Sequence, residues 1–138
     1  MSDLKPNYIY KLVSYKTPPP STVASELPEA LPISEIDKSS GFVHLSTARQ
    51  VPNTLKFFFG GDPLVYILRI KYDDVEKDIK WEDPKAEVCG PRGGEGMFPH
   101  LYNGFKLGKD EVDDILVVER GDGEWEAAIQ EVQGWMIY

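Results

Sequence analysis

The sequence predicts an α+β protein built mainly of short strands. Several short segments are rich in β-branched and aromatic residues or are almost continuously apolar, which is typical of strands. A single internal stretch has clear helical spacing, and turns rich in glycine and proline separate the segments. Short strands around one clear helix favour the α+β class.

The N-terminal part of the chain begins with a predicted strand. Residues 8–15, YIYKLVSY, are aromatic and β-branched, and the prolines of residues 17–21 end this strand in an extended loop. Residues 22–40 contain further prolines, so we expect at most one short helix there, around Val23–Ala30. A second strand is predicted over Phe42–Leu45.

The clearest helix is predicted after that second strand. Thr47 and Gln50 match the capping-box pattern of a helix start, while Pro52 favours a later start after an irregular turn. The apolar face of this helix is formed by residues at helical spacing: Val51, Leu55, Phe58 and Phe59. Residues 60–63, GGDP, end it.

The C-terminal half is predicted to contain the most buried strand. Residues 64–70 are almost continuously apolar, which indicates a strand buried on both faces. The loop over residues 83–97 is rich in glycine and proline, so we expect it to be exposed and mobile. The other predicted elements are a helical turn over 73–77, strands over 79–82, 98–102 and 112–118, and a helical tail over 124–138.

Composition limits the classes of function. The chain has 138 residues, 41% hydrophobic and 28% charged, which predicts one soluble domain with a substantial core. A net charge of −8 repels phosphate backbones and argues against nucleic acid as a partner. No apolar stretch is long enough for a membrane span. Cys89 is the single cysteine, which excludes an internal disulfide and favours the cytoplasm.

The two histidines are the main candidates for chemistry. His44 lies at the end of a predicted strand, and Ser46 and Thr47 follow it near a helix start, where backbone N–H groups favour an anion. His100 and Tyr102 share a face if their segment is extended. Each imidazole also has a structural alternative. His44 would then be a hydrogen-bonded residue at a strand end, and His100 part of an aromatic plug under the loop.

Other reaction centres find less support. His44, His100 and the Glu82 carboxylate have the donor types of a metal site with two histidines and one carboxylate, but their spacing does not require a metal, and we expect none. The loop around Arg92 matches neither the P-loop nor the dinucleotide-binding pattern. A serine hydrolase is also disfavoured, because the sequence has no nucleophile elbow.

Three motifs carry a resemblance to a known family. GFVHLSTARQV, IKWED and FPHLY, in this order, resemble the DUF952 family of small uncharacterised proteins, and LPISEIDKSSGF resembles its fungal branch. The resemblance covers about residues 9–118 of a single domain over 1–138, with a C-terminal extension over 119–138. It implies an ADP-ribosyltransferase-like split β core, mainly antiparallel, with a few short helices. RNA 2′-phosphotransferases are a more distant analogy.

The chain departs from the family pattern in two places. Lys11 stands where many bacterial members have a first-strand histidine. A lysine can hold a phosphate as a point charge but cannot reproduce the donor and acceptor geometry of an imidazole. Asn103 separates Tyr102 from the following glycine, which bacterial members place directly after the tyrosine. Both differences weaken the expectation of ordinary NAD chemistry.

The resemblance nevertheless implies one site. Its catalytic candidates are His44, Glu82 and His100, and its ligand-binding candidates are Lys11, Ser46, Thr47, Gln50 and Tyr102. The implied ligand is a nucleotide-like or phosphorylated small molecule, NAD is a candidate cofactor, and the activity would be an ADP-ribosyl- or phosphotransferase. The alternatives are a non-catalytic ligand sensor or protein-interaction module and a two-histidine phosphoesterase.

Overall fold

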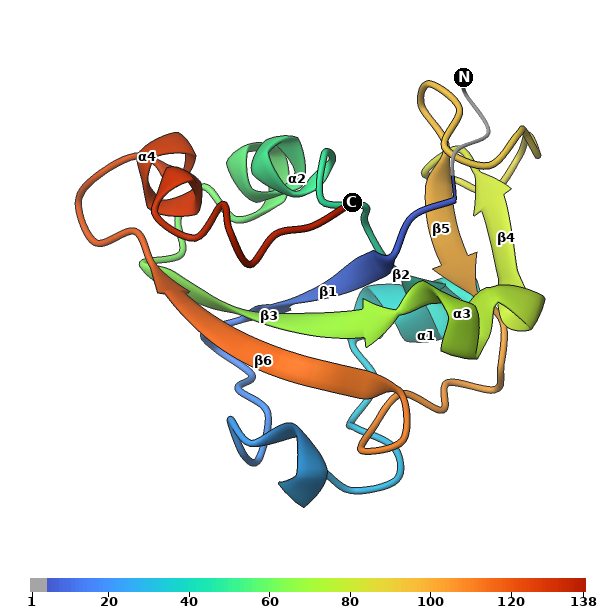
Figure 1. The fold of residues 1–138 in the computed structure, drawn as a ribbon, viewed down its shortest axis with the longest axis horizontal. Coiled ribbons are helices and arrows are strands. Elements are labelled where there is room, and N and C mark those ends of the chain that lie inside the picture. Colours follow the sequence, from blue (N-terminus) through green and yellow to red (C-terminus); the bar gives the residue numbers. More distant parts are fainter. Residues whose placement is uncertain (1–4) are drawn as a thin grey trace.

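Two antiparallel three-stranded sheets form the fold (Figure 1). The computed structural model describes residues 5–138. The first sheet has the order β1-β3-β6, with β1 at Tyr8–Ser14, β3 at Leu64–Lys71 and β6 at Val112–Glu119. The second has the order β2-β5-β4, with β2 at Val43–His44, β5 at Phe98–Leu101 and β4 at Ile79–Glu82. The predicted α+β class is confirmed.

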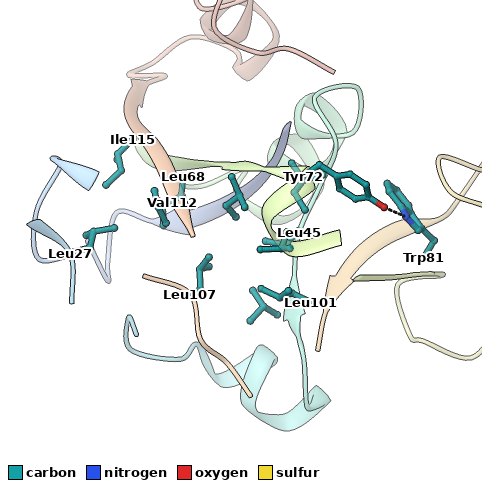
Figure 2. Packing of buried hydrophobic residues seen from close by; sticks show 13 residues of the cluster. Leu27, Leu45, Leu68, Tyr72, Trp81, Leu101, Leu107, Val112 and Ile115 are labelled. Atoms are coloured by element: carbon teal, nitrogen blue, oxygen red, sulfur yellow. Dashed lines mark hydrogen bonds between the residues drawn. The ribbon is translucent and has the colours of Figure 1, made fainter. Parts of the chain in front are cut away.

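Strand β3 is the central strand of the first sheet and is buried on both faces, as predicted. Val65 and Ile67 belong to one core cluster, whereas Leu68 and Ile70 belong to a second cluster on the opposite face. Figure 2 shows the second cluster, in which the Trp81 indole donates a hydrogen bond to the Tyr72 hydroxyl at 3.1 Å. This cluster joins the two sheets and supports the strands that carry both histidines.

Two helices cover the other face of the first sheet, namely α2 at Val51–Phe58 and α4 at Trp125–Gln130 (Figure 1). Their buried residues join the cluster around Val65 and Ile67. The predicted apolar face of α2 is wrong at Phe58, whose exposed fraction is 75%. The helix ends at Phe58. The backbone of Phe59 is not helical, and the partly buried Phe59 ring packs against the cluster around Val65 and Ile67 instead.

Residues 22–40 contain a helix that the sequence reading missed. The expected helix around Val23–Ala30 is reduced to a single 3-10 turn at Ala24–Glu26, and α1 follows at Glu35–Ser40. The Ser34 hydroxyl caps α1, and Gly41, at φ 87°, ends it in the left-handed conformation. The second strand, Val43–His44, is shorter than the predicted Phe42–Leu45.

The remaining elements follow the predicted order, but the helical tail predicted over 124–138 is helical only at α4, Trp125–Gln130. The expected helical turn consists of α3 at Tyr72–Val75 and a 3-10 turn at Glu76–Asp78. Beyond α4, the C-terminal segment returns along the first sheet (Figure 1). There the buried Tyr10 hydroxyl donates to the Ile137 carbonyl and accepts from the Ile137 N–H, both at 2.8 Å. Over residues 5–138, no helix has the length and apolar character needed to cross a membrane.

The loop over residues 83–97 is tied down at several points. Asp83 accepts hydrogen bonds from the N–H groups of Glu87 and Val88, at 2.8 and 2.6 Å. Arg92 forms an ion pair with Glu76 at 3.0 Å, and its side chain is 26% exposed. The mobility of this loop stays a prediction.

Candidate functional site

The candidate site is formed where β2 pairs with β5. In the antiparallel register of these strands, His44 lies opposite His100. The ring centroids are 5.2 Å apart, with an angle of 64° between the ring planes. Strand pairing therefore brings together two residues that are 56 positions apart in the numbering, and they are the only two histidines in the sequence.

His44 is held by a carboxylate from α1. The Oδ1 atom of Asp37 lies 2.7 Å from Nδ1 of His44 and also accepts the His44 backbone N–H at 3.1 Å. Lys11, on β1, donates to the other carboxylate oxygen, Oδ2, at 2.6 Å. Asp37 is 3% exposed, so this carboxylate is buried between one cation and one imidazole.

His100 is held by a second carboxylate, this time from β4. Oε1 of Glu82 lies 2.9 Å from Nδ1 of His100 and accepts the Tyr102 hydroxyl at 2.7 Å. The ammonium group of Lys80 lies 4.6 Å from the centre of the Tyr102 ring. Three predicted site residues, Glu82, His100 and Tyr102, therefore form one hydrogen-bonded group.

Phe42 forms the apolar wall of the site. Its ring stacks on His100 at 4.2 Å between centroids and lies 4.5 Å from His44 and 5.1 Å from Tyr102. Phe42 is 4% exposed. The sequence pattern placed Phe42 and His44 on one strand face, and the structure agrees. Phe42 limits the rotation of both imidazoles and removes water from beside them.

Electrostatics keep both carboxylates ionised at neutral pH. Burial alone would raise the pKa of Asp37, but the hydrogen bond from His44 and the charge of Lys11 outweigh it and lower this pKa to about 2. For Glu82, burial is likewise outweighed by the hydrogen bonds from Tyr102 and His100, and its pKa is lowered. Burial and the hydrogen bond to Glu82 raise the pKa of the Tyr102 hydroxyl to about 12.

These charges determine which imidazole nitrogen is available. An ionised carboxylate only accepts hydrogen bonds, so each Nδ1 carries the hydrogen toward its carboxylate. Among the described residues, the Nε2 atom of neither His44 nor His100 has a hydrogen-bond partner. Burial lowers the pKa of His100, more than the hydrogen bond to Glu82 raises it, and so favours the neutral ring. In each neutral ring the lone pair therefore lies on Nε2.

The two rings differ in access to solvent. The side chain of His44 is 26% exposed, whereas that of His100 is 1% exposed. His44 is therefore the ring that an approaching ligand meets first, and His100 lies below it.

The other predicted ligand residues lie on the segment that follows His44. Ser46 joins the two sheets, because its backbone N–H and C=O pair with Tyr10 at 2.9 and 2.8 Å. The Gln50 side chain accepts from the Thr47 N–H at 3.0 Å and donates to the Met97 carbonyl at 2.6 Å. Half of the predicted capping box is therefore formed. The Thr47 N–H, which could have bound an anion, is already hydrogen-bonded to the Gln50 side chain.

Asp37 and Phe42 are the site residues that sequence reasoning missed. The signal for Asp37 was present in the sequence, since Ser34 and Asp37 have the spacing of a capping box and Gly41 supplies the helix stop. From the local pattern alone, the Asp37 carboxylate would be expected to cap the start of the helix. In the structure it instead accepts hydrogen bonds from Lys11 and His44. Within residues 5–138, no three His, Cys, Asp or Glu side chains are placed to hold a metal ion.

Comparisons with known proteins support the family resemblance. A family model described as "Protein of unknown function (DUF952)" matches residues 18–115, which leaves Lys11 outside the matched range. The crystal structure of protein CC0527 from Caulobacter crescentus is similar, with a TM-score of 0.61 and 24% identity, and the match covers 85% of this chain and 90% of that one. For the solution NMR structure of CC0527, the TM-score is 0.57, the identity 27% and the coverage 90% and 96%. No curated protein matches the chain.

Proposed function

The chain belongs to the DUF952 family of proteins of unknown function, and from the geometry of its site we propose that it binds a phosphorylated, nucleotide-like small molecule at the His44–His100 pair. Acid–base chemistry on that ligand, as in a phosphoryl or ADP-ribosyl transfer, is the activity that we propose for the pair. The single observation that carries the proposal is the pairing of two imidazoles whose Nδ1 atoms are held by buried carboxylates, which leaves both Nε2 atoms without a hydrogen-bond partner among residues 5–138.

Burying the polar groups of this site costs free energy of folding, and this cost favours a functional role for them. Asp37, Glu82 and His100 are all buried, at 3%, 9% and 1% exposure, and buried polar groups destabilise a core unless every atom is paired. An apolar packing of the same volume would be at least as stable. A buried imidazole with one nitrogen oriented by a carboxylate and the other unpaired is typical of acid–base sites.

The two sheets support the resemblance to a split transferase core. They meet at the backbone pair between Tyr10 and Ser46, and the candidate site lies on the second sheet close to that junction. Lys11 reaches the site from the first sheet through Asp37. In this proposal the ammonium group of Lys11 attracts the ligand by its charge rather than by direct contact, because it is already paired with the Asp37 carboxylate.

A non-catalytic binding module is the second candidate, and the burial of His100 favours it. At 1% exposure this ring has little surface on which to contact a ligand directly. Phosphate would then bind at His44 alone, and no bond in the ligand would change. The two candidates differ in turnover, so one set of ligands distinguishes them.

The test is an NMR titration of the two imidazoles with inorganic phosphate, ADP-ribose and NAD. Because the sequence contains only two histidines, each signal can be assigned by a single substitution. We expect saturable shifts of the His44 signals, ligand stabilisation in a thermal melt, and loss of that stabilisation in His44→Gln. Lys16→Gln, a substitution at an exposed lysine on the loop after β1, is the control and should bind like the wild type.

The outcomes separate the candidates. If none of the three compounds shifts either imidazole or the melting temperature, the proposed ligand class is wrong. Binding accompanied by release of nicotinamide from NAD supports the transferase. Binding of NAD or ADP-ribose with both compounds unchanged supports the non-catalytic module.

A further inference from the structure

Resting on the ligand site proposed above, we propose that the His44–His100 pair hydrolyses phosphodiesters, with His100 as the general base and His44 as the general acid. This inference adds a reaction and a substrate class to the binding site. It rests on the opposed register of the two rings, on their separate carboxylates and on their unequal exposure.

The charge around the site selects a diester over a monoester. The two carboxylates, Asp37 and Glu82, face two lysines, Lys11 through an ion pair and Lys80 over the Tyr102 ring. These four charges cancel, and the nearby Asp83 carboxylate adds a negative charge that acts on His100, so a protonated His44 leaves at most one positive charge. A phosphodiester carries one negative charge and matches it, whereas a phosphomonoester carries nearly two at neutral pH.

The unequal exposure of the rings assigns their roles. The general acid must reach the leaving group of a bulky ligand, and His44, at 26% exposure, is the ring that such a ligand can touch. The general base needs to reach only a water molecule, and in this proposal that water reaches Nε2 of His100, whose side chain is 1% exposed. The surroundings of His100, with Phe42 stacked on its face, favour the neutral ring that a base requires.

The carboxylates fix the atom on each ring that takes part. Glu82 accepts the Nδ1 hydrogen of His100, so Nε2 carries the lone pair. Asp37 accepts the Nδ1 hydrogen of His44 in either protonation state, so the proton that His44 donates comes from Nε2. The ring centroids are 5.2 Å apart, and the proposed reaction requires both Nε2 atoms to lie within hydrogen-bond reach of one phosphate group and its attacking water.

The proposed step balances in atoms and charge. The water oxygen forms a bond to phosphorus while Nε2 of His100 takes one water proton. The bond between phosphorus and the leaving oxygen breaks, its electron pair stays on that oxygen, and Nε2–H of His44 protonates it. The products are a phosphomonoester and an alcohol. His100 is then protonated and His44 neutral, and proton exchange with solvent restores both rings.

The experiment uses the full chain and two diesters, bis(4-nitrophenyl) phosphate and adenosine 2′,3′-cyclic monophosphate, with 4-nitrophenyl phosphate as the monoester. We expect hydrolysis of the diesters and a lower rate on the monoester. His44→Gln and His100→Gln should each lower kcat/KM by about 10²- to 10⁴-fold, the range for loss of one acid or base. Asp122→Asn, at an exposed carboxylate on the loop before α4, should leave the rate unchanged.

His100 is buried, so His100→Gln can fail to fold, and a second measurement uses the wild-type chain. Diethyl pyrocarbonate should inactivate it by modifying the exposed His44, and hydroxylamine should restore the activity. A wild type that binds phosphate but leaves both diesters intact overturns this inference and leaves the binding proposal in place. A wild type that neither binds nor hydrolyses overturns both. Full activity in folded His44→Gln also overturns the inference.

Discussion

Asp37 and Glu82 hold His44 and His100 from separate elements, because α1 supplies the first carboxylate and β4 the second. Each carboxylate contacts Nδ1 of its own ring, at 2.7 and 2.9 Å. The two histidines therefore share one strand pair but have independent supports. This independence allows each ring to be perturbed separately, and the first prediction uses it.

Both neutral imidazoles should carry their hydrogen on Nδ1. An ionised carboxylate beside Nδ1 stabilises that tautomer over the Nε2–H form, which is the more common one in free histidine. Nitrogen-15 shifts of the two rings measure the tautomer directly. Asp37→Asn should change the tautomer balance of His44 and leave that of His100 intact, and Asp122→Asn should change neither. An Nε2–H form of His44 in the wild type would contradict the geometry.

Lys11 should contribute to stability through Asp37. Lys11→Gln removes the cation from a carboxylate that is 3% exposed, and breaking a buried ion pair costs about 3 kcal/mol in the free energy of unfolding. Urea unfolding at pH 7 measures the loss. Lys16→Gln, at an exposed position, should change stability by less than about 0.5 kcal/mol. Equal effects of the two substitutions would mean that the Lys11–Asp37 pair contributes nothing.

The ionisation of Asp37 predicts a pH dependence of stability. Its folded pKa of about 2 lies below the unfolded value of about 3.9, so its contribution is complete above pH of about 4 and is lost as the pH falls toward 2. The difference corresponds to about 3 kcal/mol. The stability gap between the wild type and Asp37→Asn should therefore narrow by most of that amount between pH 5 and pH 2. A gap that stays constant over this range would contradict the lowered pKa.

His100 predicts a second change in stability, at higher pH. Burial lowers its folded pKa below the unfolded value of about 6.5. The unfolded chain then binds a proton that the folded chain rejects, so stability is complete above pH of about 6.5 and falls as the pH decreases below it. His100→Gln should lack this fall between pH 7 and pH 5, whereas Lys16→Gln should retain it. Guanidinium unfolding at several pH values measures the difference.

Helix α2 offers a matched test of the core. Leu55→Ala should cost about 2–5 kcal/mol, because Leu55 is fully buried between the helix and the first sheet. Phe58→Ala should change the free energy of unfolding by less than about 0.5 kcal/mol, since 75% of Phe58 is exposed. Thermal or urea unfolding of both variants checks the pair. A large loss in Phe58→Ala would mean that this ring is covered in solution.

The loop over residues 83–97 should be the first region cut by trypsin, at Lys85 or Arg92. The glycine content of the loop favours mobility, but the ion pair between Arg92 and Glu76 restrains the loop around Arg92. Glu76→Gln should therefore speed cleavage after Arg92 more than cleavage after Lys85. First cleavage outside the loop, detected by mass spectrometry, would indicate that the loop is packed.

The sequence predicts the position of a strand where burial of that strand requires a recognisable apolar pattern. Residues 64–70 are apolar at every position except Arg69, and a strand between two core clusters requires such a pattern. The pairing of His44 with His100 was not predictable, because it depends on which strands become neighbours and in which register. The same holds for Asp37, whose partners come from β1 and β2. Short-range patterns describe elements, whereas a site made from several elements depends on their packing.

The contact between Tyr10 and Ile137 has a consequence for how the protein folds during synthesis. These residues are 127 positions apart, and the buried Tyr10 hydroxyl finds both of its partners on Ile137. A ribosome adds about 5–20 residues per second, so the first strand leaves the exit tunnel many seconds before its hydroxyl can be paired. Until then the C-terminal segment does not cover Tyr10, and water can pair with its hydroxyl. Burial of this side of β1 is therefore among the last steps of folding, because it waits until Ile137 has left the ribosome.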